Sequence, residues 1–116
     1  MGGALGAILR FATSNGVHYL VGRDFPYGTL TVNVLGSFLI GLFYILMMER
    51  LNVSPEIRAF LIIGVLGAFT TFSTFSLETF NLIEAGEIVK ATVNIFLSVL
   101  VCLFATWLGI LLARQL

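Results

Sequence analysis

The sequence predicts an all-α membrane protein with four transmembrane helices, the third of them broken within the membrane. Three observations support this prediction. Of 116 residues, 59% are hydrophobic and only 10% are charged, whereas a water-soluble domain carries about 25% charged residues. The apolar residues form long uncharged runs between short charged loops, and one run is rich in glycine and hydroxyl residues. We expect one four-helix domain over residues 1–116.

The expected transmembrane spans cover about residues 3–21, 29–48, 57–83 and 89–113. Four helices of about 20 residues each use most of the chain. The remaining loops are too short to fold alone, so we expect no soluble catalytic domain and no enzyme.

Local signals mark the ends of these spans. Glu49 follows the second span, and the last lies between Lys90 and Arg114. Ser54 is a candidate N-cap for the third span, and Pro55 suits the first position of that helix. The first span contains Arg10, so it forms a membrane helix only if this charge is accommodated.

The charge pattern excludes one class of partner and bears on topology. A net charge of zero offers no basic surface to nucleic acid. With four spans, three basic residues face one side of the membrane and two the other, which is too small a bias to set one orientation. We therefore predict dual topology and an antiparallel homodimer in the lipid bilayer. The residues are Arg50, Arg58 and Arg114 on one side and Arg23 and Lys90 on the other.

The segment Gly64–Ser76 predicts the break in the third span. Five of its last seven residues carry hydroxyls, which compete with the helical hydrogen-bond ladder, and Gly67 is a local weak point. Irregular backbone at membrane depth survives where protein buries it or where it lines a cavity, and its freed carbonyls can bind cations. The alternative is an unbroken Ser/Thr-bearing helix packed through small residues.

Two rows of polar residues follow the helical period. Such rows either join helices or line a narrow hydrated path, where neutral donors stabilise an anion without trapping it. The rows are Thr29, Asn33 and Ser37 in the second span, and Asn94, Ser98, Cys102 and Thr106 in the last.

Aromatic and charged residues add two hypotheses. Phe69, Phe72 and Phe75 recur every three residues, so they either form apolar contacts or present electropositive ring edges to an anion. Arg10 lies within a span, where a charge is a functional candidate by default. It could instead reach the interface or pair with Glu78, which itself belongs either to the interface or to a vestibule.

Three stretches together resemble the Fluc (CrcB) family of fluoride channels. They are Gly2–Phe11, Gly28–Phe38 and Gly64–Ser76, the last followed by Glu78. The resemblance covers nearly the whole chain, and the run Thr-Thr-Phe-Ser-Thr-Phe-Ser is its most specific part.

The resemblance implies a passive fluoride-selective channel in the inner (plasma) membrane that exports cytoplasmic fluoride through two pores per antiparallel dimer. It also implies a structural Na⁺ at the dimer interface, held by the main-chain carbonyls of Gly67 and Thr70. Arg10 and Glu78 would belong to the vestibule. The implied pore residues are Asn33, Phe72, Phe75, Ser73, Ser76, Thr31 and Ser98.

Two other functions remain open at this stage. A small multidrug-type exporter shares the length, the four spans and the weak charge bias, but it needs a carboxylate in the first span, where this chain has Arg10. A structural membrane subunit would use the polar rows only to join helices.

Overall fold

The computed structural model describes residues 1–22, 24–50 and 53–116, with Arg50 described by its backbone alone. Within these ranges the chain is helical with short connections and contains no strand, and its principal extents are 50 × 28 × 23 Å. The elements are α1 (Gly2–Val21), α2 (Tyr27–Ile45), η1 (Leu46–Arg50), α3 (Pro55–Arg58), η2 (Ala59–Leu66), α4 (Gly67–Phe69), α5 (Ser73–Glu84) and α6 (Ile88–Gln115), where η denotes π-helix.

Three helical segments among the described residues are long and apolar enough to cross a membrane. They are Tyr27–Glu49, Pro55–Glu84 and Ile88–Gln115, close to the predicted spans 29–48, 57–83 and 89–113. Helix α1 matches the predicted span 3–21 in position, but it contains Arg10, Asn15 and His18 and is not among the three. A fourth crossing therefore stays a prediction.

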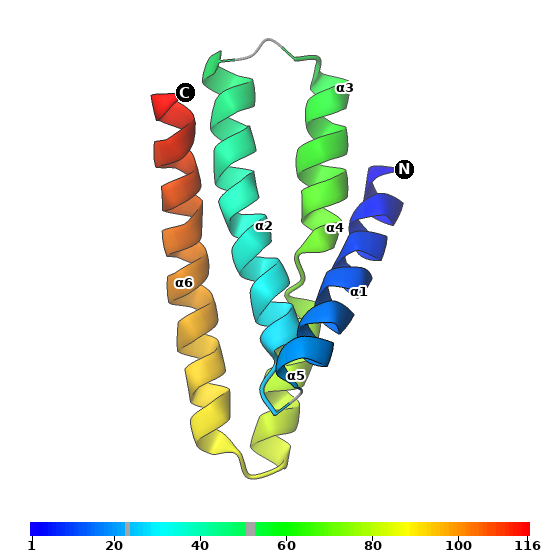
Figure 1. Ribbon diagram of the computed structural model, residues 1–116, viewed down its shortest axis with the longest axis vertical. Coiled ribbons are helices and arrows are strands. Elements are labelled where there is room, and N and C mark those ends of the chain that lie inside the picture. The colour runs from blue at the N-terminus through cyan, green and yellow to red at the C-terminus, as the bar shows by residue number, and fades with distance from the viewer. Residues whose placement is uncertain (23, 51–52) are drawn as a thin grey trace.

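Helices α2 and α6 pack side by side along their length and form the most extensive helix pair (Figure 1). A Cβ at Gly41 would overlap the Thr106 backbone, and one at Gly109 would overlap the Phe38 carbonyl. The Thr106 hydroxyl donates to the Ser37 carbonyl at 3.1 Å. Small residues thus bring the two backbones together, as is common between membrane helices.

Helix α1 crosses obliquely over α2 and the η2–α4 segment (Figure 1). A Cβ at Gly2 would lie 2.6 Å from the Phe60 carbonyl oxygen, and one at Gly6 would overlap the Val65 carbonyl. At the other end of α1, His18 Nε2 accepts a hydrogen bond from the Gly28 amide at 3.1 Å. These contacts hold one end of α1 against η2 and the other end against the start of α2.

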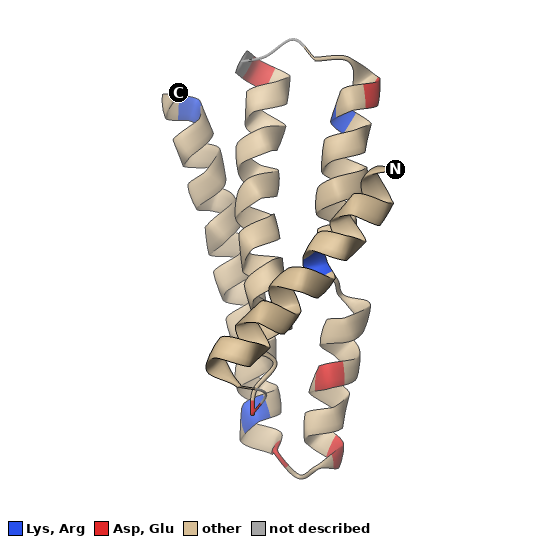
Figure 2. Ribbon diagram, turned by 45° about the vertical axis from the view of Figure 1, so that its right-hand side comes forward, with Lys and Arg blue, Asp and Glu red and all other residues tan. Residues whose placement is uncertain are grey.

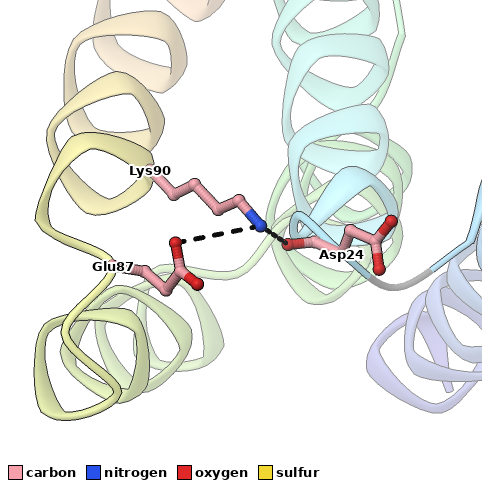
Figure 3. A network of polar contacts seen from close by, with 3 residues as sticks. All are labelled: Asp24, Glu87 and Lys90. Atoms are coloured by element: carbon pink, nitrogen blue, oxygen red, sulfur yellow. Dashed lines mark hydrogen bonds and ion pairs between the residues drawn. The ribbon is translucent and has the colours of Figure 1, made fainter.

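Charged residues gather mainly at the two ends of the bundle (Figure 2). At one end, Lys90 Nζ lies 3.3 Å from the Asp24 carbonyl and 4.0 Å from the Glu87 carboxylate, which ties the α1–α2 and α5–α6 connections together (Figure 3). At the other end, Arg114 pairs with Glu49 at 3.6 Å. Of the residues used to predict topology, Arg23 and the side chain of Arg50 lie outside the described residues.

The predicted break of the third span is confirmed. Helix α4 ends at Phe69, Thr70 is extended (φ −83°, ψ 161°), and the helix resumes at Ser73. The alternative of an unbroken helix is therefore wrong. Gly67 is not the weak point, because it keeps helical dihedrals (φ −61°, ψ −40°). The break comes three residues later, and it separates Phe69 from Phe72 and Phe75, so the three rings do not share one helix.

Candidate functional site

A cavity of about 350 Å³ lies beside the break, between α2, α5 and α6. It brings together four of the predicted pore residues, Asn33, Phe72, Phe75 and Ser98. No charged side chain is among its described lining residues. The others are Ser37, Ile40, Thr70, Thr71, Val99, Cys102 and Leu103.

Asn33 forms a two-point contact with the backbone of the break. Its Nδ2 donates to the Thr71 carbonyl at 2.9 Å, and its Oδ1 accepts from the Thr71 amide at 2.7 Å. The side-chain amide of α2 thus pairs with the N–H and the C=O of one residue, two backbone groups that the break would otherwise leave without these partners. A buried peptide group without partners is costly, so this contact stabilises the interruption.

Two carbonyl oxygens next to the break, those of Gly67 and Thr70, lack the amide donors that a continuous helix would give them. In a continuous helix the Thr71 amide would donate to Gly67 and the Thr74 amide to Thr70. Instead the Thr71 amide donates to Asn33, and the Thr74 amide donates to the Thr71 hydroxyl at 3.3 Å. The Thr70 hydroxyl lies 3.1 Å from the Leu66 carbonyl and 3.4 Å from that of Gly67.

Thr71 was missing from the predicted site, although it is the centre of these contacts. Its hydroxyl accepts from the amide three residues on, at Thr74, which is how a Ser or Thr caps the start of a helix. That spacing could have been read from the sequence. The partnership with Asn33 could not, because it joins residues 38 positions apart.

Phe72 and Phe75 form a pair at the mouth of the cavity. Their ring centroids are 5.4 Å apart and the planes are tilted by 46°. Phe75 is 9% exposed, whereas Phe72 is 75% exposed. A tilted pair turns ring edges, the electropositive part of the aromatic quadrupole, toward neighbouring groups.

A buried chain of polar groups runs behind Phe75. The Thr79 hydroxyl donates to the Phe75 carbonyl at 2.8 Å, and Asn94 Nδ2 donates to the Thr79 hydroxyl at 2.8 Å. The Ser98 hydroxyl donates to Asn94 Oδ1 at 3.4 Å. Asn94 therefore joins helices α5 and α6, as the helix-joining interpretation of the polar rows predicted, while Ser98 of the same row also lines the cavity.

A second hollow, of about 310 Å³, lies on the α1 side of the break. Arg10 lines it together with Ser14, Asn15, Thr29 and Thr74. It therefore exposes a cation and several hydroxyl and amide groups. Thr71 also lines this hollow, so it is shared with the cavity of Asn33.

Glu78 lies apart from Arg10. Its carboxylate accepts a hydrogen bond from the Thr29 hydroxyl, and it lines a third hollow of about 220 Å³ with His18, Asp24 and Asn81. Thr29, which contacts Glu78, also lines the Arg10 hollow, so the two hollows adjoin each other.

Three predicted pore residues lie outside the cavity. Ser73 and Ser76 are exposed, and the Ser73 hydroxyl lies 3.5 Å from that of Thr71. Thr31 lines a separate apolar groove with Leu30 and Val34. Their roles in conduction stay predictions.

Comparison with known proteins places the chain in a family. A family model described as CrcB-like protein, Camphor Resistance (CrcB), matches residues 1–110. The chain belongs to the CrcB family.

Relatives of this CrcB chain are named fluoride-specific ion channel FluC. A relative from Hydrogenovibrio crunogenus is 60% identical over 114 residues, which cover 98% of this chain and 86% of the relative. One from Geobacter metallireducens is 55% identical over 114 residues, 98% of this chain and 92% of the relative. One from Methylococcus capsulatus is 53% identical over 116 residues, all of this chain but 51% of that longer relative.

CrcB membership and the three apolar helical segments identify this chain as a membrane protein. The hollows at the break therefore lie within a span, where backbone outside a helix needs a partner or a water-filled surface. In this CrcB chain the amide of Asn33 is that partner.

The Asn33 contact makes a testable prediction. Asn33→Leu removes both hydrogen bonds and leaves the Thr71 N–H and C=O without these partners. We expect it to lower the free energy of unfolding by about 1–3 kcal/mol and to speed amide exchange at residues 70–72, measured by hydrogen–deuterium exchange mass spectrometry. Asn81→Leu, at an exposed position of α5, is the matched control. Unchanged exchange at the break in Asn33→Leu would contradict the assigned role.

Proposed function

We propose that this chain forms a passive, fluoride-selective channel that lets cytoplasmic fluoride leave the cell across the inner (plasma) membrane. The observation that carries the proposal is the uncharged cavity at the break, lined by Asn33, Ser98, Phe72 and Phe75, in a chain 60% identical to a fluoride-specific ion channel. A fluoride channel needs groups that replace the water of a small, strongly hydrated anion. This cavity offers such groups.

Asn33 can donate a hydrogen bond to an anion while it keeps its hydrogen bonds to Thr71 at the break. A carboxamide has two N–H donors, and the Thr71 carbonyl uses one of them. The second is available to an anion in the cavity, and the Ser98 hydroxyl, which now donates to Asn94 Oδ1, could turn its hydrogen to the same ion. The ring edges of Phe72 and Phe75 add weak electropositive contacts. Neutral donors of this kind favour entry while still allowing the ion to leave.

Arg10 supports the proposed anion path from the other side of the break. Its cationic side chain lines the adjoining hollow, and a cation in a hydrated hollow raises the local anion concentration. The exporter alternative lacks a comparable basis, because the only acid well inside the spans is Glu78 of α5, which already accepts from Thr29.

Two copies of the chain form an antiparallel homodimer with two pores in this proposal. Phe72 is 75% exposed beside the cavity, and Ser73 and Ser76 are exposed next to it. A second copy covering this face would complete the cavity wall and bring both hydroxyls to the path.

A structural sodium ion at the dimer centre fits the same break. Na⁺ is a hard cation that favours oxygen ligands such as main-chain carbonyls. The carbonyls of Gly67 and Thr70 have lost their usual amide partners to Asn33 and Thr71. Both copies would contribute these oxygens, and the ion would hold the two breaks together.

The first prediction concerns the phenylalanine edges. Phe72→Ile and Phe75→Ile retain apolar bulk but remove the ring quadrupole. We expect each to reduce fluoride efflux from liposomes by about tenfold or more, measured with a fluoride electrode. Phe80→Ile, at an exposed position of the same helix, should keep the wild-type rate.

One result would refute the channel and another would refute its aromatic mechanism. An absence of fluoride efflux with purified wild-type protein would refute the function. Wild-type efflux in both Phe72→Ile and Phe75→Ile would refute the aromatic mechanism. Proton-coupled drug uptake would instead support the exporter.

The second prediction concerns topology. Because Lys and Arg are nearly balanced between the two sides, we expect C-terminal reporter fusions to be active on both sides of the membrane. Adding two lysines at the C-terminus should shift the reporters to one orientation. Reporters of the unmodified chain found on a single side would refute dual topology.

The third prediction concerns sodium. An ion that binds only the folded dimer raises its stability with concentration. We expect the melting temperature of the detergent-solubilised dimer to rise saturably when NaCl replaces KCl at constant ionic strength. Equal melting temperatures in the two salts across the titration would refute the sodium site.

A further inference from the structure

Asn94 is the most buried polar residue of α6, with 1% of its surface exposed. Its side chain bonds at both ends, to Thr79 at 2.8 Å and to Ser98 at 3.4 Å. Among the described residues, every buried side-chain nitrogen and oxygen has a hydrogen-bond partner. Asn94 thus occupies a fully satisfied polar position within an apolar helix.

The two ends of this chain of hydrogen bonds are cavity residues. Thr79 connects Asn94 to the Phe75 carbonyl, and Ser98 is a lining residue of the cavity. Asn94 and Thr79 do not line the cavity. Their contacts therefore fix two residues of the cavity wall, on different helices, relative to each other.

The hydrogen bonds that link Phe75, Thr79, Asn94 and Ser98 differ in length. The two bonds of Thr79, at 2.8 Å each, connect Asn94 of α6 to the turn of α5 that begins at Phe75. The bond from Ser98 to Asn94, at 3.4 Å, is long and correspondingly weak. An anion in the cavity would compete with Asn94 Oδ1 for the single hydrogen of Ser98, and this long bond is the one that the anion would replace.

We infer that Asn94 is a positioning residue of the conduction path. Through Thr79 it fixes the α5 backbone that carries Phe75, and through Oδ1 it holds the Ser98 hydroxyl while no anion is present. The inference rests on the proposed fluoride channel and adds residues that do not touch the ion. A purely structural role, joining α5 to α6, is the alternative.

Thr79→Val tests the inference most directly, because it removes the hydroxyl and keeps the shape. We expect the fluoride concentration at half-maximal flux to rise by about tenfold, since the buried Asn94 donor loses its partner and the link from α6 to the Phe75 turn of α5 is lost. Thr79→Ser restores the hydroxyl and should return this concentration to within about twofold of wild type. Asn94→Leu is a second variant with the same expected effect.

Thr92→Val is the matched control. The Thr92 hydroxyl donates to the Ile88 carbonyl at 3.0 Å, which repeats the bond of Thr79 four residues back, on an exposed part of α6. This variant should leave the half-maximal concentration unchanged. All variants are measured as purified protein in liposomes, with flux counted above the leak of protein-free liposomes.

Three outcomes separate the possibilities. The inference is supported if the fluoride concentration at half-maximal flux rises in Thr79→Val or Asn94→Leu and does not rise in Thr79→Ser and Thr92→Val. A fall in maximal flux and melting temperature, with the half-maximal concentration unchanged in both variants, shows a structural role and overturns it. No fluoride efflux from the wild-type protein overturns the proposed function itself, which is a distinct failure.

Discussion

The contact between the Asn33 side chain and the backbone N–H and C=O of Thr71 is the interaction on which the other features of the break depend. It couples α2 to the middle of the third span through one donor and one acceptor. Without it, the interruption would expose a peptide group in an apolar environment, where an unmade hydrogen bond is expensive. The cavity, the freed carbonyls and the position of Phe72 all follow from keeping this segment out of the helix.

The bundle supplies the rigid frame for this contact. Glycines bring the backbones of α2 and α6 together at Gly41 and Gly109, so Asn33 and Ser98 lie on two helices that cannot easily shift. Helix α1 is seated by glycines as well, at Gly2 and Gly6. The irregular segment is thus flanked by two closely packed helix pairs, α2 with α6 and α1 with η2.

Much of the fold could be predicted from local patterns, because uncharged runs and their end signals act over short distances. The break could be predicted from its run of hydroxyls, but its place could not. Gly67 stays helical, and the deciding contact of Thr71 reaches across to Asn33. Helical spacing predicted the two polar rows, and both contribute residues to the cavity, but the spacing left open whether they join helices or line a path. Thr31, two positions before Asn33, points to another face, as that spacing requires.

Thr71 is the one residue named here that lines both the cavity of Asn33 and the hollow of Arg10. Its backbone amide and carbonyl bind the Asn33 side chain, and its hydroxyl accepts from the Thr74 amide in the next turn. The two hydrogen bonds to Asn33 therefore do not depend on which side chain stands at position 71, whereas the cap on the next turn needs its hydroxyl. Proline is the exception, because an imide has no hydrogen to offer the carboxamide opposite.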